Sequence, residues 1–503
     1  MNDRRFALAL ALLVAFVLSL PALLPRAALA NTFYDDAYYY FVIARHLIDT
    51  GSFTFDGLHA TNGYQPLWLF AIVPLFAVFH DIDAPVRAVV VLQALISGGT
   101  AYVIARTLTA RIGRAPAGIA AATVVALPTL HLVVASGMES ALLLFFLVCI
   151  WRQYLTRTET NGLTALGILC ALSFWTRPES LVAPAVIAVA LYRQRRLDRR
   201  RALQLIIPIV IALVGYFLFN ELTSGIALPI SGLIKSNGEI SRRLGGGTVW
   251  ERLIGSIPAF PLAWAIAAPH PQLASALAWL LIVAASAAAI VYRRRLRRAI
   301  DDAGVGLPLV ICALFWVAQT ALLKITAPWY GVWLVLATAL GLGALTAGRR
   351  WAPLVFYAFV LAALARGALH TRRSWRATQL MEADVIDAAV WMKQQLRPNE
   401  RVGSWNAGLF AYYCGCTVVN LDGLVNDVAF YRQAIVARGL VAYLRQQQIH
   451  WLADDILSVD SFARPSFGLT TDQLAQQPMT LVRSFCAAGD PTCGGFGVWR
   501  TTD

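Results

Sequence analysis

The chain has 503 residues, of which 58% are hydrophobic and only 14% charged, and its mean hydropathy is +0.62. This composition excludes a soluble globular protein and indicates many membrane spans. The net charge of +14 does not indicate nucleic-acid binding, because the arginines form short clusters between apolar runs, at 193–201, 293–298 and 348–350. Such clusters are typical of cytoplasmic loops of membrane proteins.

Apolar runs of spanning length recur along the chain. We expect about eleven transmembrane helices, near residues 6–24, 86–105, 115–134, 140–155, 162–176, 180–192, 203–219, 273–292, 305–323, 329–347 and 351–369. The first run could also be the core of a signal peptide, since small residues follow at 27–30. Its length of about 20 residues favours a spanning helix.

One apolar run, residues 65–79, is shorter and contains Pro74. If this run does not cross, the arginine clusters all lie on the same side as the N-terminal arginines, as the positive-inside bias requires. We therefore predict that it is an interfacial or re-entrant helix within one long outer loop, 25–86, and we interpret 257–269 in the same way. The N-terminus is then cytoplasmic, and the chain after 370 is extracytoplasmic.

The tail is more polar than the rest of the chain. Residues 383–396 show helical apolar spacing, and 429–447 is also helix-like. Short runs rich in strand-forming residues lie at 400–405, 417–422 and 449–454. Alternating strands and helices predict a small α/β domain at 370–503, which follows a polytopic α-helical membrane domain at 1–369.

Four of the seven cysteines lie in this tail: Cys414, Cys416, Cys486 and Cys493. An extracytoplasmic tail would favour their oxidation. Cys414 and Cys416 are too close for an easy mutual bridge on an extended chain, so we predict bonds from them to Cys486 or Cys493.

Under this topology, the polar side chains that could carry chemistry all lie on the outer side. They are Asp35, Asp36, His46, Asp56, His59, Asn62 and Gln65 in the first loop, and Glu139, Arg177, Glu179, Lys235, Trp329 and Tyr330 at span ends. Simpler interpretations remain for each: the aspartates can cap the helix 37–49, and the aromatic residues fit a belt at the membrane surface. The histidines have no second ligand at metal-binding spacing.

Six segments resemble, in chain order, the GT-C superfamily of multi-spanning glycosyltransferases, which take sugar from a polyprenyl-phosphate lipid. They are "DDAYYYFVIARHLIDTGSFTFDGLHATNGYQPLW" (35–68), "SGMESALLLFF" (136–146), "WTRPESL" (175–181), "LPISGLIKS" (228–236), "VGSWNAGLFAYY" (402–413) and "VNLDGLVND" (419–427). The hallmark of that superfamily is a pair of acids in the first outer loop. The resemblance covers nearly the whole chain and implies the GT-C fold.

The resemblance implies that an aspartate of the pair Asp35 and Asp36 acts as a general base on the acceptor or binds a divalent metal such as Mg²⁺ or Mn²⁺. We expect Asp35 to be the more sensitive of the two. Arg177 and Lys235 are the candidates for holding the donor phosphate. The candidates for binding substrate are Tyr38, Tyr39, His59, Asn62, Gln65, Trp68, Glu139, Glu179, Trp329 and Tyr330.

We therefore predict a membrane glycosyltransferase that moves a hexose or pentose from a polyprenyl-phosphate donor to a glycan, lipid or protein acceptor on the outer face. A ligase or polymerase of lipid-linked glycans is the alternative among enzymes. A transporter or flippase is less well supported, since the two halves of the chain differ and the acids lie in a loop rather than at mid-membrane.

The arginine distribution predicts that Ser140, Ser224 and the tail face outward, while the loop 193–201 faces inward. In a background without native cysteines, a cysteine at Ser224 should react with an impermeant maleimide in intact cells. A cysteine at Leu197 should react only after permeabilisation. Strong labelling at 197 in intact cells would contradict both the orientation and the interpretation of 65–79.

Overall fold

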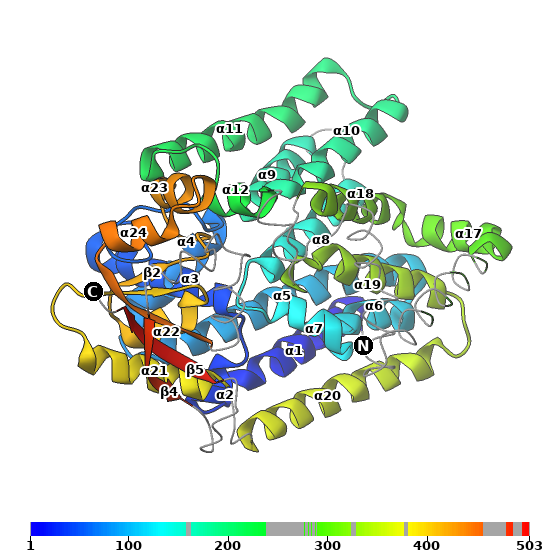
Figure 1. Ribbon diagram of the computed structural model, residues 1–503. Coiled ribbons are helices and arrows are strands. Elements are labelled where there is room, and N and C mark those ends of the chain that lie inside the picture. Colours follow the sequence, from blue (N-terminus) through cyan, green and yellow to red (C-terminus); the bar gives the residue numbers. More distant parts are fainter. Residues whose placement is uncertain are drawn as a thin grey trace.

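The computed structural model describes residues 2–156, 162–237, 289–322, 328–376, 381–455, 479–485 and 495–501, with isolated positions between 276 and 287. The predicted segment 257–269, most of the predicted span 273–292, and Cys486 and Cys493 lie outside these residues. Figure 1 shows a helical bundle with a small sheet at the end where α2 and α3 lie, while α17 lies at the other end.

Most of the chain before residue 376 is helical. The first part contains α1 (Asp3–Ser19), η1 (Leu20–Leu23), α2 (Arg26–Ala30), α3 (Asp35–Thr50), α4 (Pro66–Val78), α5 (Ala84–Ile112), α6 (Arg114–Ala126), α7 (Pro128–Val134) and α8 (Ser140–Thr156). The second contains α9 (Gly162–Thr176), η2 (Pro178–Leu181), α10 (Val182–Arg193), α11 (Arg199–Ser224), α12 (Ile230–Ser236), α17 (Arg293–Ala303), α18 (Gly306–Leu322), η3 (Pro328–Tyr330), α19 (Val332–Thr346) and α20 (Ala352–Arg376).

Several of these helices are long and apolar enough to cross a membrane. Among the described residues there are four, within α1, α5, α11 and α20, or five if α17 and α18 form one bent span. Five further apolar helices, including α4, have between 10 and 17 residues. The chain is therefore built as a multi-span membrane protein, and the count of eleven spans stays a prediction.

The segment between η1 and α5, which was predicted to be the first outer loop, folds into α2, α3 and α4. α3 ends at Gly51, which adopts the left-handed conformation that glycine tolerates best. α4 starts with Pro66 at a favourable first-turn position and carries Pro74 inside it. At about 1.5 Å per residue, its 13 residues span roughly 20 Å, which is shorter than the hydrocarbon core of a bilayer.

The described part of the tail contains five strands, and the three predicted strand runs coincide with β1, β2 and β3. Its elements are α21 (Met381–Gln395), β1 (Arg401–Ser404), α22 (Ala407–Cys414), β2 (Val418–Asn420), α23 (Val428–Phe430), the π-helix η4 (Tyr431–Val436), α24 (Leu440–Gln446), β3 (Ile449–Asp455), β4 (Met479–Phe485) and β5 (Phe496–Thr501). The sheet order is β2-β1-β3-β5-β4. β1 is parallel to β2 and β3, whereas β5 is antiparallel to β3 and β4.

The tail packs directly on the segment that contains α2, α3 and α4, and both contribute to one hydrophobic core. The ring of Tyr38 in α3 lies 5.4 Å from that of Tyr412 in α22. Arg45 of α3 covers the same Tyr412 ring at 4.1 Å and donates a hydrogen bond to its hydroxyl. This shared core fixes the sheet relative to α3 and so positions the polar side chains between them.

The prediction for Cys414 and Cys416 is wrong, because the structure joins these two residues to each other, with a Cα–Cα distance of 5.1 Å. The prediction assumed an extended chain. Instead α22 ends at Cys414 and Gly415 adopts a left-handed conformation, which turns the chain so that the two thiols meet. Ser140 is also fully buried, so Ser224 is the useful position for labelling.

Gly408, in the first turn of α22, should not tolerate a side chain. A Cβ there would collide with the carbonyl oxygen of Asp35 in α3. Overpacking of this kind costs about 1–3 kcal/mol, so Gly408→Ala should lower the melting temperature by a few degrees and speed proteolysis of the tail. Gly341→Ala in α19 is the control, since a Cβ there meets no atom within 4 Å. Equal melting temperatures for the two variants would contradict the close packing of α3 on α22.

Candidate active site

Asp35 binds the N-terminus of α22. Its two carboxylate oxygens accept hydrogen bonds from the backbone amides of Leu409, at 2.7 Å, and Gly408, at 2.9 Å. No side chain of α22's own cap residue, Asn406, caps this helix, so Asp35 supplies the cap from far upstream. Burial raises the pKa of Asp35 to about 7, against the opposing effect of the two amides.

Asp36 instead faces Lys235 of α12. The carboxylate lies 3.9 Å from the ammonium nitrogen, which donates a hydrogen bond of 2.9 Å to the hydroxyl of Tyr330 in η3. Burial raises the pKa of Asp36, and the positive charge of Lys235 partly offsets that rise. The side chains of Asp36 and Lys235 keep 20% and 12% of their surface exposed, so a ligand can reach this ion pair. Asp35 differs in its partners, since both of its carboxylate oxygens accept hydrogen bonds from α22.

Arg177 occupies the turn between α9 and η2 and is almost completely buried. Its guanidinium lies 3.1 Å from Glu179 and 3.4 Å from Glu139, and it stacks on the ring of Tyr330 at 4.0 Å. Although burial lowers the pKa of Arg177, the two glutamates raise it above its ordinary value. Lys235 lies 5.3 Å from the same ring, so Tyr330 connects the two cations of the site.

Tyrosines of α3 extend this cluster toward the loop and the sheet. The hydroxyl of Tyr40 donates to Glu139, at 3.0 Å, and accepts from the backbone amide of Gln65. The hydroxyl of Tyr39 donates to Asp422, at 2.9 Å, just after β2. The side-chain oxygen of Gln65 is buried and has no hydrogen-bond partner in the described part of the chain.

Four of the predicted substrate-binding residues have structural partners instead. His59 bonds Asp56, at 2.6 Å, within its own loop. Asn62 donates hydrogen bonds to the carbonyls of Ile226 and Leu228, in the segment that precedes α12. Trp68 is buried and donates to the carbonyl of Gly137, and Tyr38 lies in the core shared with α22. Trp329 packs on the ring of Tyr34 at 4.6 Å, beside the cluster.

The sequence interpretation missed two acids at the carboxyl ends of the parallel strands. Asp422 follows β2, and burial raises its pKa to about 7, with the charge of Asp36 adding to this rise. Asp454 in β3 accepts hydrogen bonds from the amides of Trp405 and Asn406 and so shapes the turn that leads into α22. Their position as the last residues of the predicted strand runs 417–422 and 449–454 was the available signal, since ligand sites of α/β folds form at that edge.

Within the described ranges, no three side chains among His, Cys, Asp and Glu are grouped closely enough to hold a metal ion. Asp36 has Lys235 beside it, and Asp35 has two amide donors, so each carboxylate already has a partner of opposite polarity.

The fold is shared with solved structures of two membrane-associated transferases, which agrees with the fold that the sequence resemblance implied. The structure is similar to that of ArnT from Cupriavidus metallidurans in the apo state, with a TM-score of 0.58, 13% identity, and coverage of 98% of this chain and 97% of that chain. The same enzyme bound to undecaprenyl phosphate gives a TM-score of 0.56 with the same identity and coverage.

A second neighbour is the Archaeoglobus fulgidus oligosaccharyltransferase in complex with zinc and sulfate. Its TM-score is 0.51 at 11% identity, with 94% of this chain and 70% of that chain covered. Residues 371–496 match a family described as a domain of unknown function, DUF8728. No curated protein matches the sequence. At these identities, the neighbours establish the fold, and the activity has to be argued from the site.

Arg177→Gln should destabilise the protein strongly, because it leaves Glu139 and Glu179 without their shared cation. Breaking a buried ion pair costs about 3–5 kcal/mol. Arg177→Gln combined with Glu139→Gln should recover part of the lost melting temperature, since one uncompensated charge is then removed as well. The two single variants and the double variant together give the coupling between the residues. Purely additive losses would contradict the ion pair.

Proposed function

We propose that this protein is a glycosyltransferase that moves a sugar from a polyprenyl-phosphate donor to a hydroxyl acceptor on the outer side of the membrane. The observation that carries the proposal is the cluster of Asp36, Lys235 and Tyr330, which offers an accessible carboxylate next to an accessible cation. The GT-C fold across almost the whole chain supports this assignment. One ArnT structure with that fold binds undecaprenyl phosphate, which is a lipid of the proposed donor class.

The proposed reaction needs two groups of opposite charge. The acceptor oxygen attacks the anomeric carbon of the sugar, the bond from that carbon to the phosphate oxygen breaks, and the phosphate leaves with the bonding electrons. Asp36 takes the proton of the acceptor hydroxyl as general base. Lys235 stabilises the negative charge that grows on the leaving phosphate.

Lys235 is better placed than Arg177 to contact the phosphate directly. Its partner Asp36 lies at 3.9 Å, beyond hydrogen-bond distance, so the ammonium can turn to a third group. Arg177 is almost fully buried between two glutamates and reaches the ligand side only through Tyr330. We therefore assign Arg177 to positioning Tyr330 and to supporting the positive potential around Lys235.

The aspartate pair divides its roles in this proposal. Asp36 is the base, and Asp35 holds α22 against α3 and thereby orients Asp36 from the neighbouring position. Glu139, Glu179, Tyr39, Tyr40 and Asp422 surround the reacting groups through the hydrogen bonds described above. The sheet edge and the first outer loop form the walls at which an acceptor is expected to bind, with the N-terminus of the chain on the cytoplasmic side.

Asp36→Asn should abolish transfer while leaving the fold intact, because it removes only the base. Loss of a positioned general base costs typically about 10²–10⁴-fold in rate. Asp35→Asn should lower the melting temperature, since its amide group would face a backbone amide that needs an acceptor, at a cost of about 1–3 kcal/mol. The measurement is mass spectrometry of glycans and glycolipids from deletion cells that express each variant, followed by turnover with the donor so identified, with and without Mg²⁺ or Mn²⁺.

Asp49→Asn is the matched control, because Asp49 is an exposed aspartate near the end of the same helix. It should behave as the wild type in both activity and melting temperature. Transfer of a complete glycan rather than one sugar would favour the alternative, a ligase or polymerase of lipid-linked glycans. Near wild-type turnover by both Asp36→Asn and Asp35→Asn would show that the pair is structural and would contradict the proposed mechanism.

A further inference from the structure

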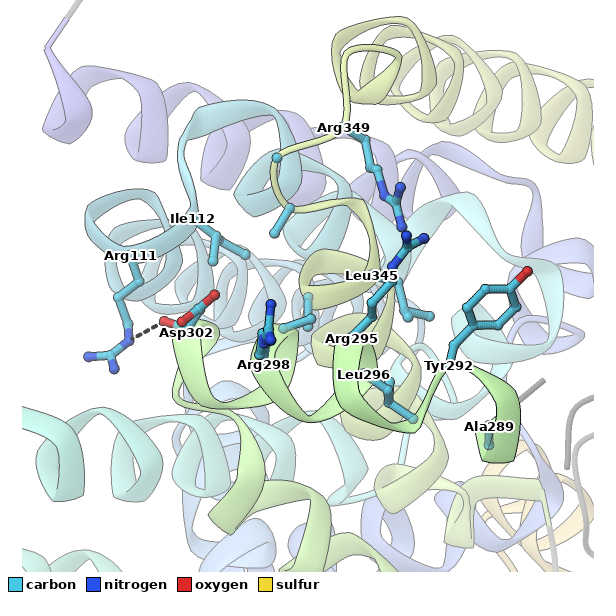
Figure 2. A pocket seen from close by; sticks show the side chains of 14 residues that line it. Arg111, Ile112, Ala289, Tyr292, Arg295, Leu296, Arg298, Asp302, Leu345 and Arg349 are labelled. Atoms are coloured by element: carbon cyan, nitrogen blue, oxygen red, sulfur yellow. Dashed lines mark hydrogen bonds between the residues drawn. The ribbon is translucent and has the colours of Figure 1, made fainter. Parts of the chain in front are cut away.

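A large cavity lies far from the aspartate pair, at the other end of α5. It has a volume of about 1200 Å³ and is bounded by the C-terminal end of α5, by α17 and by the end of α19 (Figure 2). Gln93 of α5 bonds the backbone beside Glu139, whereas Arg111 of α5 lines the cavity. At about 1.5 Å per residue these two positions are roughly 27 Å apart along the helix, close to the thickness of a bilayer core.

The lining of this cavity is strongly basic. It contains four arginines and one carboxylate, namely Arg111, Arg295, Arg298, Arg349 and Asp302. Figure 2 shows the side chains of Arg295 and Arg349 extending toward each other from α17 and from the connection after α19. Arg111 donates a hydrogen bond to the backbone carbonyl of Asp302 rather than to its carboxylate.

Three of these arginines have no ion pair with a carboxylate in the part of the chain that the structure describes: Arg295, Arg298 and Arg349. The salt bridge on α17 joins Arg297 to Asp301, and neither residue lines the cavity. Like charges that face one another across a cavity repel, and an anion placed between them removes that repulsion. The arrangement therefore favours a bound anion.

The helix α17 has the geometry of an interfacial helix. It meets α18 at a bend of 105°, so that if α18 crosses the membrane, α17 runs along the membrane surface. Its sequence "RRRLRRAIDDA" places arginines around Leu296, which lines the cavity. Ile112 and Leu345 line the same cavity from α5 and α19, so its walls combine cations with apolar side chains.

We propose that this cavity binds the headgroup of an anionic phospholipid from the membrane leaflet on the arginine-rich side. Arg295, Arg298 and Arg349 contact the phosphate, and Ile112, Leu296 and Leu345 contact the first part of the acyl chains. The cavity is far larger than a single phosphate ion, and its apolar walls suit a lipid better than a soluble anion. This site is separate from the proposed transferase site and does not depend on that activity.

The test compares two pairs of arginines on the same helix. Arg295→Gln/Arg298→Gln removes two cavity arginines, and Arg294→Gln/Arg297→Gln removes two that do not line the cavity. Binding of dioleoyl phosphatidylglycerol to the purified full-length protein is measured by native mass spectrometry, with dioleoyl phosphatidylcholine as the neutral reference. Each cavity arginine should contribute about a factor of five, so the first pair should weaken binding about 25-fold.

The control pair should bind phosphatidylglycerol as the wild type does. Arg349 lies outside α17, and Arg349→Gln should weaken binding about fivefold. Weaker binding by this variant cannot be caused by misfolding of α17. Equal weakening by both α17 pairs would show only general attraction to basic surface charge and would overturn the proposal. Displacement of phosphatidylglycerol by inorganic phosphate at millimolar concentration would also overturn it, in favour of a site for soluble anions.

Discussion

The contact between the Asp35 carboxylate and the first amides of α22 joins the tail to α3, and the arrangement of the site depends on it. The positive end of a helix that lacks its own side-chain cap attracts a carboxylate that lies 373 residues upstream. This contact places the C-terminal ends of the parallel strands next to α3. It also fixes the rotation of α3 about its own axis. The next residue, Asp36, points about 100° around the helix and therefore toward α12. The two adjacent aspartates therefore have different partners: the amides of α22 bind Asp35, and Lys235 lies beside Asp36.

The polar cluster beyond Asp36 is stable because each of its buried charges has a partner. Arg177 lies between Glu139 and Glu179, and the ring of Tyr330 covers the remaining face of its guanidinium. Burial of an ion requires this level of compensation, since desolvation costs several kcal/mol per ion. A compensated cluster is also a rigid one, so Tyr330 and Lys235 keep their orientation before any ligand arrives. Preorganised charge of this kind is what stabilisation of a leaving phosphate needs.

The sequence predicted several of the charged residues that the structure brings together, but not Asp422, and not the partner of each one. The expected topology grouped Asp36 of the first loop with Glu139, Arg177, Lys235 and Tyr330 at span ends. The structure joins Asp36, Lys235 and Tyr330 by direct contacts and places Arg177 against Glu139 and Tyr330. The separate roles of Asp35 and Asp36 depend on α22, whose position no local pattern encodes. Asn62 and Trp68 likewise have partners more than 60 residues away. The bridge between Cys414 and Cys416 depended on the conformation of Gly415, which the spacing alone did not reveal.

The cations near the two ends of α5 differ in whether they are paired with carboxylates. Near Gln93 the cations are paired with carboxylates inside the fold, whereas the arginines around Arg111 lack such partners among the described residues. A cluster that binds a reacting phosphate must also release its product. Carboxylates that compete for the cation help this release, because they weaken binding of the phosphate in the ground state. A site for a resident lipid has no such requirement, and unpaired arginines can hold the anion permanently. The difference in pairing therefore matches transient binding at one end of the bundle and stable anchoring at the other.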